Sequence, residues 1–479
     1  MDIQPGPCGG PRESGRAKRA AVLVHEKPTG SRSARKRSLS VKFSLAILLA
    51  GLGLVEQPGW AAVSGPPDFD VPEAQLVDDL RIVIEREFER YDSDYRAQFR
   101  KFESRLQAAQ KRLHDAARTG NAMDCSTQIA REAKWLLTHT AHWTRLAATM
   151  DRLEASLAVE DQDFALKQSS VDGAWGVCYR EWFLKLDATI DALSDLQARG
   201  EVPRYPLTFL EQVDDVDKLT RTVQQLLVSD VAATGMDHRD ELNELTESMA
   251  QLLFKPELKA YVVEKVRGFE ITDRMVDRYR QFLDRWQDAG NGYWSALYRV
   301  GGKIYRSHDL SMTYHLVSYR EGRVNHWPEI IDTTLAIKRF EYPYGWMARD
   351  GYNDHNNYDI AKIFRYGWPH MGTSQRERVS REIDAMVDWC LTSSVKADGS
   401  IRSDPEFYES LDDHYYFALS FLDIVGYWDP AKRFWSSRRF PGARHLCESF
   451  KETLQRLVHD SWSARAAMER LPADCASVP

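Results

Sequence analysis

The sequence predicts an all-α protein in which an N-terminal helical bundle is followed by an incomplete α/α toroid of helix–helix hairpins. Two patterns support this prediction. From Val71 to about Leu253, apolar residues recur at every third and fourth position, as they do along amphipathic helices. From about Ile271 onward, a frame that begins with Asp and ends thirteen residues later with Gly occurs three times. The 479 residues are enough for two or three domains, and we expect boundaries after residues 62 and 270.

Residues 1–62 are expected to be a disordered leader followed by a Sec-type secretory signal. Residues 1–40 are rich in Gly, Pro, Ser and Arg and have no apolar period. Basic residues then precede the apolar run Phe43–Val55, which is too short to cross a bilayer and is followed by small residues. We expect the mature chain to begin near Val63, to be secreted or periplasmic, and to keep no membrane span. The alternative is an uncleaved anchor or a buried core helix.

The charge of the mature chain argues against nucleic-acid binding. Beyond residue 62 the chain carries 54 basic and 67 acidic side chains, a net charge of −13. Proteins that bind a phosphate backbone do so through clustered cations, which this composition does not favour. Hydrophobic residues make up 43 % of the chain and aromatic residues 11 %, so we expect it to bury a core rather than remain disordered.

The cysteines of the mature chain predict two disulfides, because export permits their formation. Their order suggests that Cys125 pairs with Cys178 and Cys390 with Cys447, which leaves Cys475 over. The sequence has no Cys or Cys/His spacing typical of a zinc site, and no nucleotide-binding, serine-hydrolase or zincin motif. We therefore expect no cofactor and no metal.

Residues 63–270 are predicted to form the helical bundle. Breaks fall at Gly120, Gly173 and Gly200, where turn residues interrupt the apolar period. Charges of both signs alternate on the faces expected to be exposed. No group of side chains in this region suggests a reaction.

Residues 271–479 are predicted to form three hairpins, each with a leading and a following helix. The leading helices occupy the frames Asp309–Gly322, Asp354–Gly367 and Asp413–Gly426, in which Asp is expected to cap the N-terminus and Gly the C-terminus. The following helices are Pro328–Phe340, Gln375–Leu391 and Ala443–Val458. Because polar and aromatic residues gather near the start of each leading helix, we expect these N-termini to open on a shared cavity.

The densest polar stretches lie at two of these helix starts, Tyr352–Asp359 and Glu409–Tyr416. Helix N-termini that meet at one pocket favour an anionic ligand, and Tyr and Trp provide flat faces for sugar rings, so we expect an acidic polysaccharide as the substrate. The candidate catalytic residues are His355, Asn356, Asn357, Tyr358, His414 and Tyr416. The candidate substrate-binding residues are His308, Tyr314, Trp346, Asp354, Trp368, Asp413 and Tyr415.

Two reactions fit these residue types. In β-elimination from a uronic acid, Asn or His binds the carboxylate so that the C5 proton becomes acidic, and Tyr or His removes that proton. Glycoside hydrolysis instead needs two carboxyl groups at a set separation. Its candidates are Asp354, Asp359, Glu409, Asp412 and Asp413. A non-catalytic glycan-binding or cell-envelope scaffold protein is the third hypothesis.

The export signal, the helix hairpins and the run Asp354–Tyr358 resemble the polysaccharide lyases of the α/α-toroid kind, including the alginate-lyase-like families. The resemblance covers about residues 270–460. It implies that Asn or His neutralises the uronate and that Tyr or His acts as base and acid. Those alginate lyases place a pair of Asn ahead of a His, whereas here His355 precedes Asn356 and Asn357. A polysaccharide lyase is the expected function.

Overall fold

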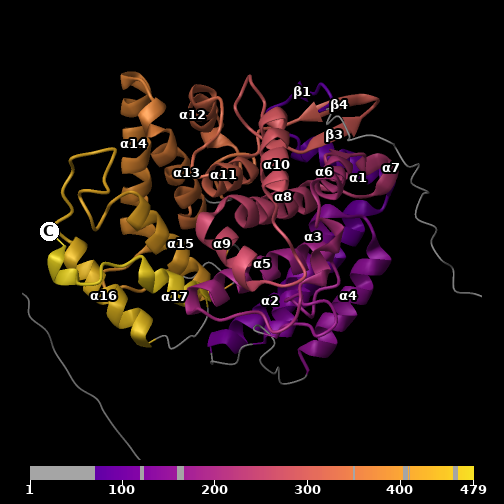
Figure 1. Ribbon diagram of the computed structural model, residues 1–479, viewed down its shortest axis with the longest axis horizontal. Helices are drawn as coiled ribbons and strands as arrows, with labels where there is room; N and C mark the ends of the chain where they lie inside the picture. Colours follow the sequence, from indigo (N-terminus) through magenta and orange to yellow (C-terminus); the bar gives the residue numbers. More distant parts are fainter. Residues whose placement is uncertain are drawn as a thin grey trace, which may run out of the picture. The chain divides into compact units, whose positions relative to one another are not determined.

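Helices dominate the computed structural model (Figure 1), in agreement with the predicted all-α class. The structure describes residues 71–118, 123–158, 167–348, 351–402, 408, 410–456 and 462–478. The predicted leader and secretory signal, residues 1–62, lie outside these ranges. From Val63 onward the chain forms one compact unit.

The helices of the first part begin and end where the sequence provides caps. They are α1 (Arg81–Tyr91), α2 (Tyr95–Arg118), α3 (Asp124–His139), α4 (Trp143–Ser156), α5 (Trp182–Arg199), α6 (Val216–Leu226), α7 (Val231–Thr234), α8 (Arg239–Phe254), α9 (Pro256–Lys265) and α10 (Asp273–Trp286). Asp215 caps α6 by accepting hydrogen bonds from two backbone N–H groups. Pro256 stands in the first turn of α9, and Gly200 ends α5 with a φ of 69°.

The helices of the second part lie close to the predicted positions. They are α11 (Leu310–Tyr319), α12 (Trp327–Ala336), α13 (Asp354–Gly367), α14 (Thr373–Trp389), α15 (Leu411–Ile424), α16 (Ala443–Arg456) and α17 (Trp462–Glu469). Helices α11, α13 and α15 are the leading helices, and α12, α14 and α16 are the following ones. Short 3-10 turns occur at Thr208–Gln212, Ile337–Arg339, Trp368–His370 and Cys475–Ser477, and a π turn at Cys390–Ser394.

The predicted caps of the leading helices are correct for α11 and wrong for the other two. Asp309 caps α11 by accepting a hydrogen bond from Met312 N at 3.0 Å. In α13 the cap is Asn353, and in α15 it is Ser410, because these earlier side chains reach the first free N–H groups and Asp is then already helical.

The expected Gly caps are also only partly correct. Gly322 and Gly426 follow α11 and α15 with φ of 73° and 70°, the left-handed conformation that glycine adopts without strain. Gly367 keeps a helical φ of −74° at the end of α13. A 3-10 turn continues directly from it, which leaves no place for a left-handed cap.

A small four-stranded sheet, which the sequence reading missed, joins distant parts of the chain. Its order is β1 (Gln75–Leu76), β4 (Lys303–Arg306), β3 (Leu297–Val300) and β2 (Val228–Ser229). Strands β3 and β4 form an antiparallel hairpin around Gly301 and Gly302, and the outer strands add in parallel. The Gly-Gly pair between two short alternating runs was the available signal for this hairpin.

Six helices from both sides of residue 270 pack side by side. Helix α5 packs on α8, α8 on α11, α11 on α13, α13 on α15, and α15 on α17 (Figure 1). An ion pair between Arg465 of α17 and Asp195 of α5 then connects the last member of the series to the first. We call these six helices the central helices. The boundary expected after residue 270 therefore does not separate two packing units in the described part of the chain.

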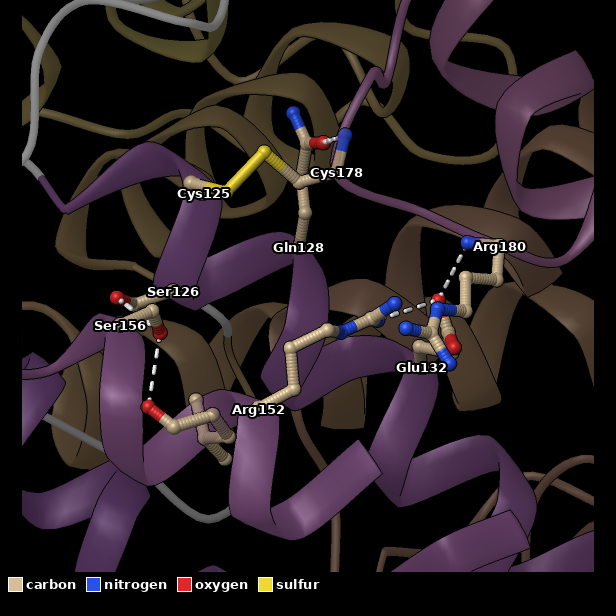
Figure 2. Close-up of a disulfide and its surroundings, with 9 residues drawn as sticks. Cys125, Ser126, Gln128, Glu132, Arg152, Ser156, Cys178 and Arg180 are labelled. Atoms are coloured by element: carbon tan, nitrogen blue, oxygen red, sulfur yellow. Dashed lines mark hydrogen bonds and ion pairs between the residues drawn. A yellow bond between two sulfur atoms is a disulfide. The ribbon is translucent and has the colours of Figure 1, made fainter. Parts of the chain in front are cut away.

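The structure confirms one predicted disulfide and corrects the other. Cys125 and Cys178 are bonded, and Gln128 beside them accepts a hydrogen bond from Cys178 N at 3.1 Å (Figure 2). Cys447 pairs with Cys475 and not with Cys390, which is buried and not in a disulfide among the described residues. Cys447 and Cys475 have Cα atoms 5.7 Å apart, within the range a disulfide needs, because the chain turns back after α17 onto α16.

Two hydrophobic cores hold these elements together. The larger core runs through both parts of the chain and includes the fully buried rings of Trp294 and Trp346. The smaller core lies between α2, α3 and α4, where Leu136 and Met150 are fully buried. None of the helices in the described ranges combines the length and the apolar content that a bilayer crossing needs.

Candidate functional site

The central helices carry polar residues at a spacing of four, which places them on one face of each helix. These stripes are Asp187, Asp191 and Asp195 on α5, Asn243, Glu247 and Gln251 on α8, and Ser311, His315 and Tyr319 on α11. Most other positions of these helices are apolar and buried. A polar stripe on a helix that is otherwise apolar is unusual, and here neighbouring helices each have one.

The stripes meet in one group of side chains, which we call the central cluster. Its members are Asp187, Asp191, Glu244, Glu247, Lys255, Tyr314, His315, Tyr319, Tyr358, Lys362, Tyr416 and Arg470. Lys255 interacts electrostatically with Asp191, Glu247, Lys362 and Arg470. Tyr319 interacts with Asp191 and with Tyr358 and Tyr416. The cluster thus receives side chains from α5, α8, α11, α13 and α15 and from the residue that follows α17.

Solvent reaches the cluster although protein surrounds it. Asp191 is exposed, and Lys255, Lys362 and Arg470 are partly exposed. Burial is nevertheless the largest influence on the pKa of each of these groups. It raises the pKa of Asp191 well above its ordinary value and lowers the pKa of Lys255 to about 8. These side chains are therefore partly covered by protein and partly in contact with solvent.

Three tyrosines at the cluster are joined by hydrogen bonds around the phenol of Tyr358. Lys362 Nζ donates to Tyr358 Oη at 3.1 Å, and the phenols of Tyr314 and Tyr416 bond to the same oxygen. Tyr416 in turn bonds to Arg470. Burial raises the pKa of Tyr358, while Arg470 and the two neighbouring phenols oppose this shift. The net result is a pKa above the ordinary tyrosine value, so the neutral phenol of Tyr358 is favoured over the phenolate.

The cations of the cluster have no carboxylate partner within the described ranges. Among the residues that the structure describes, no carboxylate oxygen lies within 4.0 Å of Lys255 Nζ, of Lys362 Nζ or of the Arg470 guanidinium. Lys255 donates to Gln251 Oε1 at 3.0 Å and lies 4.5 Å from the centre of the Tyr319 ring. Lys362 donates to Tyr358 Oη at 3.1 Å, so these cations are held by neutral groups.

Carboxyl groups gather on the α5 and α8 side of the cluster. Oxygens of Asp187, Glu244 and Glu247 lie within 4.8 Å of one another, close enough to ligate one cation. The protein itself supplies Arg131, which lies 2.7 Å from Asp187 and 3.5 Å from Glu244. His315 forms an ion pair with Glu247, and this partner raises the pKa of the imidazole in spite of burial. Burial and Asp187 raise the pKa of Glu244. We assign no metal here.

Asp354 and His414, both predicted site residues, lie in a separate and sealed group at the starts of α13 and α15. His414 Nε2 is 3.1 Å from Asp354 Oδ2, and Ser394 donates to the same oxygen. The ring of Tyr408 stacks on His414 with centroids 3.8 Å apart, and Tyr408 Oη accepts from Asp354 N at 3.1 Å. We call these four residues the helix-start network. All four are buried.

His355, Asn356 and Asn357 lie beside this network. The His355 side chain is 20 % exposed, and its Nδ1 is 3.1 Å from Asn356 Oδ1 and 3.9 Å from Asp359 Oδ2. Asn356 donates to the carbonyl of Trp346 at 2.8 Å, which fixes a loop to the helix. Asn357 is fully buried, and neither of its amide atoms has a partner within the described ranges.

The predicted substrate-binding residues are dispersed, except for Tyr314. Trp346 is fully buried and donates to Thr334 O at 2.7 Å, and Tyr415 donates to Gly399 O at 3.2 Å. Trp368 packs edge-on against Phe434. The ring of His308 packs edge-on against Tyr293. Asp413 accepts a hydrogen bond from Ser463. Of all predicted site residues, the structure brings Tyr314, Tyr358 and Tyr416 together in the central cluster.

The sequence reading did not propose Lys255, Lys362, Arg470 or the carboxyl groups of α5 and α8 as site residues. A signal was present in the run Leu186–Leu196, where Asp recurs at every fourth position between Leu, Ile and Ala. Alternating charges in the first half of the chain were instead assigned to exposed faces. Arg470 gave no signal, because its place in the cluster depends on how the chain returns after α16.

Comparison with protein-family models, with curated proteins and with solved structures finds no match to this chain.

Proposed function

We propose that this protein is a polysaccharide lyase that cleaves an acidic polysaccharide in the central cluster, and that the central helices form an α/α toroid around it. The observation that carries the proposal is the Tyr358 phenol, which accepts a hydrogen bond from Lys362 Nζ and lies against the rings of Tyr314 and Tyr416, beside cations that lack a carboxylate partner among the described residues. Both features suit a uronic acid, whose carboxylate needs cations and whose C5 proton needs a base.

The residues of the cluster fit the steps of β-elimination. Lys255 and Arg470 bind the uronate carboxylate, and this neutralisation makes the C5 proton acidic. Tyr358 takes that proton in its phenolate form, which burial disfavours and Arg470 favours, so the reaction should be fastest at alkaline pH. The electron pair of the C5–H bond forms the C4–C5 double bond, and the bond from C4 to the glycosidic oxygen breaks. Tyr416, bonded to Arg470, gives its proton to the leaving oxygen. One sugar chain ends in an unsaturated uronate and the other in a new hydroxyl.

The proposed compartment is the periplasm or the extracellular medium. The two disulfides of the described residues form and persist in oxidising compartments. The Sec-type secretory signal predicted at residues 43–62 is what would direct the chain to export. N-terminal sequencing of the protein recovered from culture medium or periplasm tests this, with a first residue near Val63 expected.

Glycoside hydrolysis is the second candidate, and the carboxyl group of α5 favours it. Asp191 and Glu244 have raised pKa values, whereas Arg131 neutralises the neighbouring Asp187. A protonated carboxyl beside an ionised one is the arrangement that an acid and a nucleophile or base require. In this reaction Asp191, which solvent reaches, donates the proton.

A panel of acidic and neutral polysaccharides distinguishes the two reactions. A lyase releases products with the ultraviolet absorbance of an unsaturated uronate, whereas a hydrolase releases reducing ends without it. Tyr358→Phe should abolish the lyase products. Tyr415→Phe is the matched control, because the Tyr415 phenol bonds to Gly399 O outside the cluster. If the protein releases reducing ends without ultraviolet absorbance, and Asp191→Asn abolishes this release, the protein is a hydrolase and not a lyase. Binding without any product would reject both.

A further inference from the structure

We propose that a second site, separate from the central cluster, holds one sugar ring of a polysaccharide chain. The site is a pocket of about 280 Å³ at the start of α5, between the loop that precedes this helix and the 3-10 turn Thr208–Gln212. The inference goes beyond the proposed function, because it concerns binding alone and needs no reaction.

The pocket lies on the side of α5 that faces away from the stripe of Asp residues. Trp182 and Lys185 line the pocket and are three residues apart, so they share one face of the helix. Asp187 and Asp191 follow Lys185 by two and six residues, which places them on the other side of the helix. The lining residues that the structure describes therefore include no member of the central cluster.

Aromatic side chains form an apolar wall of the pocket. The rings of Trp182 and Phe209 stack with centroids 5.2 Å apart, and Trp182 Nε1 donates to Phe209 O at 3.3 Å. Phe209 N in turn donates to Asp172 O at 2.9 Å. Because Trp182 is partly exposed, these contacts hold a flat apolar surface in place before a ligand arrives, which lowers the entropy cost of binding.

The remaining side chains of the pocket are polar and balanced in charge. Arg180 and Lys185 contribute two cations, and Asp172 and Glu211 contribute two carboxylates. In the described part of the chain, no ion pair of 4.0 Å or less joins any of these four side chains to a partner. Gln212 adds an amide that can both donate and accept. Donors and acceptors of hydrogen bonds are therefore both available to a ligand.

This combination fits a sugar better than an ion. An anion would meet the two carboxylates and a cation would meet Arg180 and Lys185, so charge alone gives neither an advantage. Each hydroxyl of a sugar ring both donates and accepts, so it can bond to a cationic and a carboxylate side chain at once. The apolar face of the ring can then lie on Trp182. The volume is at the small end for ligand pockets and suits one ring of a longer chain.

Affinity electrophoresis through gels that contain a polysaccharide tests the inference. The gels hold a polyuronate, a uronate–hexosamine polymer or a neutral β-glucan, and every protein carries Tyr358→Phe to prevent cleavage by the proposed lyase. Lys185→Ala with Gln212→Ala should weaken the affinity for the retarding polymer about tenfold, because hydrogen bonds to the ring are lost. Lys134→Ala with Gln107→Ala, at exposed positions of α3 and α2, is the matched control and should keep the affinity. Equal affinity of the two double variants, or free passage through all three gels, would overturn the inference.

Hydrogen exchange gives a second measurement that needs no change in the pocket. With the retarding polymer present, the backbone amides around Trp182 and Phe209 should exchange more slowly, and a lack of protection there would also overturn the inference. The outcome is separate from that of the proposed function. Protection without products on any polymer supports the pocket and rejects the lyase, whereas products together with equal affinity of the two double variants keep the lyase and reject the pocket.

Discussion

The helix-start network and the central cluster both include residues of α13, since Asp354 belongs to the network and Tyr358, one turn later, to the cluster, and the two groups differ in their contact with solvent. In the network, Asp354, Ser394, His414 and Tyr408 bond to one another and are sealed from water. In the cluster, Lys362 and Arg470 lack carboxylate partners among the described residues, and water reaches them. The comparison shows that polar density alone does not identify a site, because dense polar residues also fasten helix starts.

The distinguishing property is contact with solvent. Asp354 Oδ1 and His414 Nδ1 of the network also lack hydrogen-bond partners in the described part of the chain, but their side chains are buried. Lys255, Lys362 and Arg470 of the cluster are partly exposed, so a ligand can approach them. The comparison therefore predicts that changes in the cluster reduce activity, whereas changes in the network reduce stability.

The largest effect is expected for Lys362→Met, which keeps the length of the side chain and removes the charge. Loss of the donor to Tyr358 Oη should lower kcat/KM on the polysaccharide by about 10²- to 10³-fold. The free energy of unfolding should stay the same or rise, because an unpaired buried cation is removed. Steady-state kinetics and denaturant unfolding on one preparation measure both quantities. A large loss of stability would show that Lys362 belongs to the framework.

The second-largest effect is expected for Asp354→Ala in the helix-start network. This change leaves Ser394 and His414 without their shared acceptor, and it should lower the free energy of unfolding by about 3 kcal/mol. Activity per folded molecule should remain within a few-fold of the wild type. Denaturant unfolding measures the free energy of unfolding, and steady-state kinetics normalised to the concentration of folded protein measure the activity. An activity loss as large as that of Lys362→Met at unchanged stability would place Asp354 in the site.

A smaller effect is expected when either disulfide is removed, and the two removals can be compared. Replacing either pair with Ser should lower stability by about 2–4 kcal/mol. Only the change of Cys447 and Cys475 should also lower activity, by about tenfold, because Arg470 lies between α17 and Cys475. Cys125 and Cys178 join α3 to the loop before α5 and provide the matched control. Equal activity of the two variants per folded molecule would show that packing of α17 on α15 holds Arg470 without the disulfide.

The smallest effect is on the pH dependence of KM. The pKa of Lys255 is lowered to about 8, so its amine is charged below that pH and neutral above it. If the amine binds the substrate carboxylate, KM should rise a few-fold as the pH passes above about 8. Lys255→Arg should lose this inflection, because arginine stays charged. The same lowered pKa means that stability increases as the pH rises from about 8 toward the ordinary lysine value, since the unfolded chain binds the proton more tightly. A KM that is flat across this range would remove Lys255 from binding.

The sequence predicted the helical class and the positions of the hairpin helices, because these depend on local patterns; of the tyrosines in the cluster it selected Tyr314, Tyr358 and Tyr416 but not Tyr319. Apolar periods and turn residues mark helices within a few residues, as in α13. The second disulfide and the place of Arg470 could not be predicted, because both depend on the path of the chain after α16. The carboxyl groups of α5 were visible in the sequence, but the position of Asp187 beside Glu244 and Glu247 depends on the packing of α5 against α8.

The ion pair between Arg465 and Asp195 links positions 270 residues apart in the chain. A ribosome adds about 5–20 residues per second, so Asp195 exists for roughly 15 to 50 seconds before Arg465 is made. Arg470 is made later still. During synthesis the growing polypeptide therefore contains Tyr358, the proposed base, well before Arg470, and a product that stops short of residue 470 has the helices without this guanidinium.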